Sequence, residues 1–289
     1  MKKIFLFIFI LNLCFLPSHA FDFFNKTPNA QIKTTIKKYN KALSSHDVKE
    51  VKTFYADDYK SMDGFSLDEV SQMLEKTYEA YKNIKYKTKI ISINANDEWA
   101  LVQLKDKTSA KIYPTEIKEL KKEKMGKLSG KSIYNIYLKN KNGSWKITSD
   151  EVLIEETSLK YGIANKLDMD LISPLKVESG QEYDVSLKID KPKDITALAS
   201  ITREEIAYPP ADYQEKFRKI PEIGELERVV KANSKNLNEY AIASIGLTKV
   251  TINEAQTKAR IEVLGMAYLM KRVNLDVVKK RNEVLVENK

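Results

Sequence analysis

The sequence predicts a two-domain protein, in which an α+β domain precedes an all-β sandwich. Three observations indicate this fold class: residues 30–81 show helical periodicity, four strand-like segments follow within residues 84–154, and the chain from about residue 168 is almost wholly strand-like. Helices followed by an antiparallel meander are typical of α+β domains. Many short strands separated by turns are typical of β-sandwiches.

The first 20 residues have the pattern of an export signal. Lys2 and Lys3 precede an apolar run from Ile4 to Leu16, and the small residues Ser18 and Ala20 follow it, as a signal peptidase requires. The run is about 13 residues long, shorter than the roughly 20 that span a bilayer. We expect cleavage after Ala20 and a periplasmic or extracellular protein, with a retained N-terminal anchor as the alternative. No later stretch predicts a transmembrane helix.

Cleavage would change the chemistry available to the protein. Cys14 is the only cysteine, and His46 would be the only histidine left. Disulfides and zinc or iron sites built on Cys or His are therefore nearly excluded, and we expect no metal or cofactor. The net charge of +9 falls to +7 without Lys2 and Lys3. Because the lysines are spread and no cluster of Arg with aromatics is present, nucleic acid is not expected as a partner. The Lys-, Asn- and Ile-rich composition favours a bacterial source.

The first domain is expected at residues 30–160, after a short lead-in at 21–29. Its first helix carries one apolar stripe made by Ile32, Ile36, Tyr39 and Leu43, which recur at helical spacing. Asp47 can cap a second helix, with Glu50 three residues later.

A third helix start is marked more strongly. Ser66 and Glu69 form a capping box, and Phe65 and Val70 have the spacing of a hydrophobic staple. Strands are then predicted near residues 84–90, 99–104, 132–138 and 145–154. Asn142-Gly143 joins the last two as a hairpin, because its turn needs residues that tolerate positive φ.

A linker at 161–167 is expected to lead into the second domain at 168–280, with a C-terminal tail at 281–289. Roughly seven short strands at regular spacing predict a β-sandwich of immunoglobulin type. The Cys-Trp-Cys hallmark of that fold is absent, so this prediction depends on the strand spacing.

The first domain resembles the nuclear transport factor 2-like superfamily, which includes SnoaL-like polyketide cyclases and ketosteroid isomerase. The resemblance covers roughly residues 30–160 and depends on the helical opening, the segment Phe54–Tyr59, the helix at Ser66, and the meander through Gly143 and Trp145. It implies a cone-shaped fold of three helices and an antiparallel sheet. It also implies dimerisation through that sheet, which is common in the superfamily.

The resemblance also implies a candidate site. Tyr39 and Asp63 fall where the isomerases have a hydrogen-bond donor and a proton-shuttling acid. The strand where a second acid would be expected has none, and Tyr134 and Asn135 are the polar residues there that could donate instead. The alternatives are structural: Tyr39 lies on the apolar stripe as a core aromatic would, and Asp63 before Gly64 could shape a turn.

The sequence therefore favours an exported, non-enzymatic binding protein, with a cone domain for a ligand or partner and a sandwich for interactions. A small hydrophobic ligand and an envelope protein are the partners considered. One alternative is an isomerase- or cyclase-like enzyme that transfers a proton on an apolar carbonyl compound. Another is an envelope scaffold with a filled cone.

Overall fold

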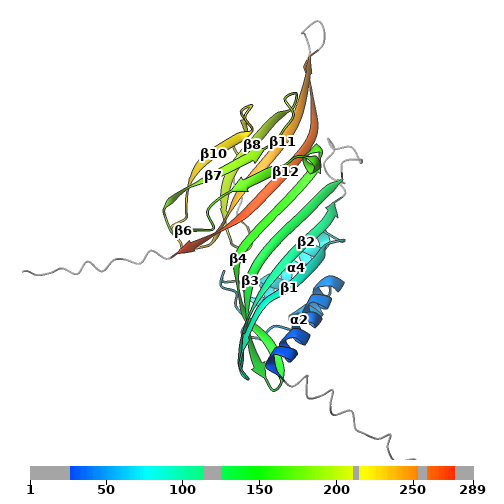
Figure 1. Ribbon diagram of the computed structural model, residues 1–289, viewed down its shortest axis with the longest axis vertical. Helices are drawn as coiled ribbons and strands as arrows, with labels where there is room; N and C mark the ends of the chain where they lie inside the picture. The colour runs from blue at the N-terminus through cyan, green and yellow to red at the C-terminus, as the bar shows by residue number, and fades with distance from the viewer. Residues whose placement is uncertain (1–26, 113–124, 211–214, 253–258, 277–289) are drawn as a thin grey trace, which may run out of the picture.

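The computed structural model describes residues 27–112, 125–210, 215–252 and 259–276. The predicted signal at 1–20 and the predicted tail at 281–289 lie outside these ranges. The described chain is mostly β-sheet with few helices (Figure 1). The helices are α2 (Pro28–Ser45), α3 (Val48–Lys52) and α4 (Leu67–Ala80), with a 3-10 helix, η1 (Ile163–Lys166). No helix in the described ranges is long and apolar enough to cross a membrane.

The strands form one large sheet and one small sheet. The large sheet has the order β1-β2-β3-β4-β12-β11-β8-β9 with β6 beside β12, and the small sheet has the order β10-β7-β5. In chain order, the strands are β1 (Lys85–Ala95), β2 (Trp99–Ile112), β3 (Gly126–Lys141), β4 (Ser144–Gly162), β5 (Met169–Ile172), β6 (Lys176–Glu178), β7 (Glu182–Ile189), β8 (Thr196–Glu205), β9 (Arg218–Lys219), β10 (Glu225–Lys231), β11 (Glu239–Ile252) and β12 (Ala259–Asp276).

The helix starts follow the capping residues in the sequence. Asp47 accepts a hydrogen bond from Glu50 N at 2.9 Å at the start of α3. Ser66 and Glu69 form both halves of the capping box of α4. The three predicted helices are therefore present, and each begins where a side chain satisfies backbone N–H groups that have no partner within the helix.

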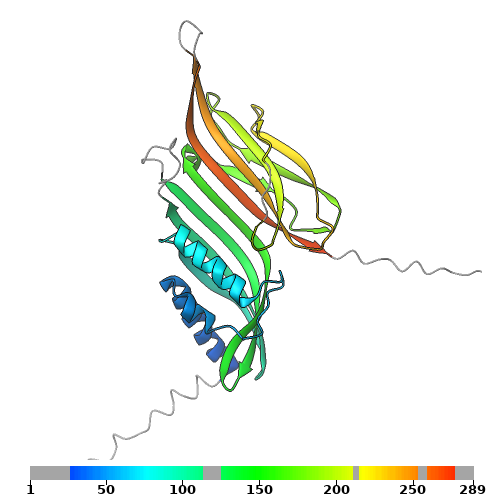
Figure 2. The same cartoon turned by 180° about the vertical axis from the view of Figure 1, so that it is seen from behind.

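Strands β1 to β4 form the antiparallel meander expected for the first half. Asn142 and Gly143 have φ angles of 53° and 83°, as the hairpin between β3 and β4 requires. The helices cover one face of these strands (Figure 2). The core there joins apolar side chains of α2 to those of the sheet, and its most buried members include Ile32, Ile36, Val102, Leu104, Leu138 and Ile147.

Strand β4 continues past the meander and pairs with β12, from Glu156–Lys271 to Gly162–Gly265. Residues 161–167, where the sequence suggests a linker, contain the end of β4 and η1. One sheet therefore runs through both halves of the chain.

The small sheet packs on the opposite face of the large sheet from the helices (Figures 1 and 2). Cross-strand partners share a face, so Lys131, Glu156 and Lys271 lie on one side. In β12 that side also carries Ala267 and Leu269, which belong to the core shared with β7 and β8. In β3, the side that carries Lys131 faces away from the inward-facing side chain of Leu138.

The separate immunoglobulin-type sandwich is not confirmed. The second half does contain two packed sheets, but one of them is the continuation of the first sheet through β4 and β12. The last described strand, β12, runs from Ala259 to Asp276 and lies between β4 and β11. Alternation within a segment predicts a strand, but it does not identify the strand's partner.

The junction of β4 with η1 requires a glycine. Gly162 has φ 57° and ψ −134°, and a Cβ there would lie 2.2 Å from the Leu264 carbonyl oxygen. We expect Gly162→Ala to lower the free energy of unfolding by about 1–3 kcal/mol, measured by urea titration. Gly180, with φ 80° and open space around it, is the matched control. An equal loss in Gly162→Ala and Gly180→Ala would contradict this account of the junction.

Candidate functional site

A row of polar side chains lies inside the helix-covered half. The hydroxyls of Tyr39 and Tyr55 are 2.9 Å apart. The ring of Tyr55 packs edge-on against Tyr59 with centroids 4.7 Å apart, and Tyr59 donates a hydrogen bond to Asp150 at 2.5 Å. Tyr39 is thus a buried aromatic of α2, as the apolar stripe indicated, and its hydroxyl is engaged by a second tyrosine.

Asp63 lies at the other end of this row and contacts the second half of the chain. Its carboxylate accepts hydrogen bonds from Arg272 at 2.6 and 3.0 Å and from Asn238 at 2.7 Å. The Arg272 side chain is 2% exposed and that of Asp63 10%. No hydrogen bond joins Tyr39 to Asp63 in the described chain. Asp63 is therefore part of a buried ion pair between residues 209 positions apart.

Tyr134 and Asn135 point to opposite faces of β3, because successive side chains of a strand alternate. Tyr134 faces the interior and donates to Asp106 at 3.0 Å. Asn135 faces the other side, where it donates to Glu151 at 3.1 Å. Only one of these two candidates therefore lies near Tyr39.

The interior contains two acids, Asp106 and Asp150, that are not among the site residues predicted from the sequence. Burial raises the pKa of both Asp106 and Asp150. Asp106 Oδ1 is buried and has no hydrogen-bond partner among the described residues. The inward-facing series Ala100, Val102, Leu104 reaches Asp106 at the next step, and extending the predicted strand beyond 104 would have found it.

These interior groups could exchange a proton, since a buried carboxyl with a raised pKa lies beside tyrosine hydroxyls. However, most of their polar atoms are hydrogen-bonded to one another, and the space between sheet and helices is occupied by core side chains. Within the described ranges, no group of three His, Cys, Asp or Glu side chains could hold a metal ion.

A second feature lies on the uncovered face of β1 to β3. Eight exposed lysines away from the β3–β4 hairpin share this face by cross-strand register, and we call this set the lysine face. Its members are Lys85, Lys87, Lys89, Lys105, Lys107, Lys111, Lys127 and Lys131. None of the eight forms an ion pair within the part of the chain that the structure describes.

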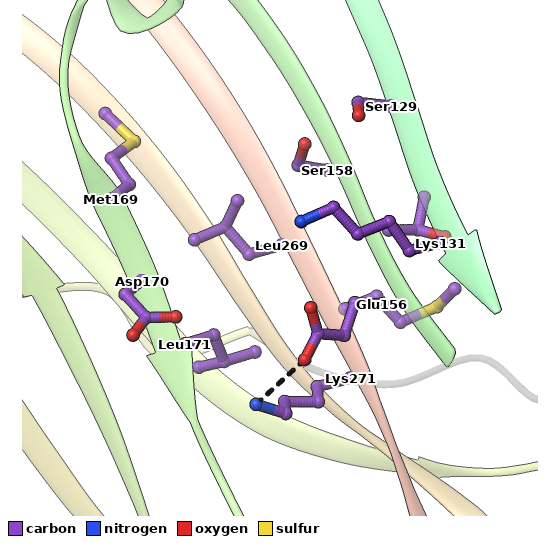
Figure 3. A pocket seen from close by; sticks show the side chains of 11 residues that line it. Ser129, Lys131, Glu156, Ser158, Met169, Asp170, Leu171, Leu269 and Lys271 are labelled. Carbon is purple, nitrogen blue, oxygen red and sulfur yellow. Dashed lines mark ion pairs between the residues drawn. The ribbon is translucent and has the colours of Figure 1, made fainter. Parts of the chain in front are cut away.

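The lysine face ends at a cavity of about 230 Å³ between the two sheets. Figure 3 shows Lys131 and Ser129 of β3 on one side of it, β5 on the other, and Leu269 of β12 between them. Glu156 forms an ion pair with Lys271, with a distance of 3.1 Å between carboxylate oxygen and amine nitrogen. Asp170 of β5 also lines the cavity and forms no ion pair within the described ranges.

No family model and no curated protein matches this chain. Among solved structures, Bd1075 of Bdellovibrio bacteriovorus is similar with 16% identity and a TM-score of 0.34, over 42% of this chain and 38% of that one. A putative dehydratase from the nuclear transport factor 2-like family of Streptomyces avermitilis has 12% identity and a TM-score of 0.34, over 42% and 92%. A SnoaL-like polyketide cyclase of Agrobacterium tumefaciens has 13% identity and a TM-score of 0.29, over 44% and 90%. The similar folds cover less than half of this chain, and similarity at this level supports no activity for it.

The buried ion pair gives a sharp stability test. Arg272→Met leaves Asp63 buried without its cation, and removal of one partner of such a pair costs about 3–5 kcal/mol. We expect that loss in urea unfolding, and substantial recovery in the double variant Asp63→Leu/Arg272→Met. Asp68, whose ion pair with Lys52 is exposed, provides the control Asp68→Ala with a much smaller effect. A loss in Arg272→Met no larger than the control's would show that the pair does not hold the halves together.

Asp106 predicts a pH dependence. Because burial raises its pKa in the folded state, its contribution to stability is complete below the unfolded pKa of about 3.9 and is lost as the pH rises through the folded pKa. Asp106→Asn cannot ionise, so its stability relative to the parent should increase from about pH 4 to about pH 7. Urea midpoints at several pH values measure this difference. The exposed Asp184 supplies the control Asp184→Asn, and parallel profiles for all three proteins would refute the prediction.

Proposed function

We propose that this is an exported, non-catalytic binding protein that takes an anionic partner on its lysine face. The observation that carries the proposal is the set of eight exposed lysines on one sheet face, none of which forms an ion pair among the described residues. Like charges held together on one surface raise the local potential and attract an oppositely charged partner.

The state of the two candidate catalytic residues supports a binding role over proton transfer. Asp63 is held by Arg272 and Asn238, and a base must be free to take up a proton from substrate. The hydroxyl of Tyr39 is bonded to that of Tyr55. The isomerase-like alternative would have to break both arrangements.

The kind of charge disfavours nucleic acid as the partner. The lysine face contains no arginine, which is the residue of choice for nucleic-acid recognition. Face-to-face pairing of two copies would bring lysines against lysines, which disfavours the homodimer expected from the superfamily. The filled core under α2 likewise gives less support to a hydrophobic ligand inside the cone.

The test is binding of poly-L-glutamate to the chain beginning at Phe21, measured by calorimetry at several salt concentrations. The variant Lys87→Gln/Lys107→Gln/Lys131→Gln removes three neighbouring charges of the lysine face, where cross-strand pairing places them in one row. At about 0.5 kcal/mol for each exposed contact, we expect roughly a tenfold loss of affinity and a weaker salt dependence.

The matched control removes the same charge from α2, where Lys33, Lys37 and Lys38 are exposed. Lys33→Gln/Lys37→Gln/Lys38→Gln should bind poly-L-glutamate almost as the parent does. Equal losses in the two triple variants would mean that only net charge matters. The lysine face would then not be the binding site.

A further inference from the structure

Strand β5 pairs with β7 alone among the described strands, so its other edge is free within the described ranges. The backbone orientation of β5 follows from a single hydrogen bond. Asp190 N donates to Asp168 O at 3.0 Å, and the register continues with Met169 opposite Ile189 and Asp170 opposite Lys188. In an antiparallel pair, alternate residues direct both backbone groups toward the partner. Asp170 therefore bonds toward β7, whereas Met169 and Leu171 direct their N–H and C=O groups toward the free edge.

This free edge borders the cavity. Met169, Asp170 and Leu171 line it together with Ser129 and Lys131 of β3 and Ser158 of β4. β5 packs over β12. The unpaired edge of β5 therefore faces β4 and β3 (Figure 3). Unpaired backbone groups at a sheet edge are a template for another strand.

We propose that the free edge of β5 binds an extended acidic peptide segment of a partner protein as an added strand. This inference rests on the proposed function, because the lysine face supplies the charge. The added strand would lie above the outer surface of β4 and β3, and every second side chain would face that surface. Main-chain hydrogen bonds to the edge give affinity in this mode of recognition, and the surface below gives specificity.

The charges at the cavity define which side chains fit. Lys131 is exposed and forms no ion pair among the described residues, because Glu156, which lies opposite it on β4, is paired with Lys271. Acidic side chains facing the sheet would therefore meet Lys131 and, further along β3, Lys127. Asp170 on β5 disfavours an acid directly beside it. The peptide is expected to carry its acids on the side toward β3.

The experiment compares two probes on the chain from Phe21. One is a twelve-residue peptide alternating Glu and Thr, and the other is the same peptide with the backbone nitrogens of both Glu and Thr methylated. Because alternate residues direct their backbone groups to opposite edges of a strand, methylating both removes the donors on either edge that could pair with β5, without changing the charge. Since each lost hydrogen bond costs a factor of a few, we expect the methylated peptide to bind about tenfold more weakly.

A protein variant tests the same edge. Met169→Pro removes a backbone N–H that faces the cavity and none that bonds to β7, a position where a sheet edge accepts proline. It should weaken binding of the unmethylated peptide about tenfold while leaving binding of dextran sulfate, a polyanion without peptide groups, unchanged. Circular dichroism monitors folding. If Met169→Pro does not fold, the comparison of the two peptides on the parent protein decides.

The outcomes separate this inference from the proposed function. Equal binding of both peptides, with loss only in Lys131→Gln, would overturn strand addition and leave the lysine face as a charge-based site. Failure of every polyanion to bind would overturn both. A dimer in size-exclusion chromatography that peptide does not dissociate and Met169→Pro abolishes would show that the edge pairs with a second copy, and would also overturn the inference.

Discussion

The antiparallel pairing of β4 with β12 is the constraint on which the rest of the structure depends. It joins the helix-covered half to the half that carries the small sheet, from Glu156–Lys271 to Gly162–Gly265. Because the last strand lies beside the fourth, Arg272 reaches Asp63 across the chain. The same pairing places β5 beside the outer surface of β3. Both the buried ion pair and the cavity are therefore consequences of one strand contact.

The large sheet buries one face under the helices at one end and its other face against the small sheet at the other end. Inward-facing residues of β2 and β3, such as Leu104 and Leu138, pack under the helices, while the other face carries lysines. Past β4, that other face becomes the core shared with the small sheet, where Leu269 and Ala243 are buried. The helices and the small sheet cover opposite faces at the two ends of the large sheet, so the covered face changes at a boundary within the sheet. The cavity and the free edge of β5 lie at this boundary.

Local features were predictable from the sequence, and long-range ones were not. Capping residues at 47 and 66 and the pair Asn142-Gly143 act within a few residues, so helix starts and the hairpin could be identified. Lysines that alternate with apolar residues at 85, 87 and 89 could be assigned to one strand face, but not to a surface shared with β2 and β3. The contact of Asp63 with Arg272 spans 209 residues, and the β4–β12 pairing that makes the sheet continuous spans 103 to 115 residues. Asp106 lies beyond the predicted second strand, which ends at residue 104, whereas β2 continues to Ile112.

The most direct test of the account is to map the binding surface by amine acetylation and mass spectrometry, with and without the acidic Glu-Thr peptide. We expect Lys131 and its neighbours Lys107 and Lys127 to become protected, while Lys33 and Lys37 on α2 react as before. Protection spread evenly over all exposed lysines, or confined to α2, would contradict it.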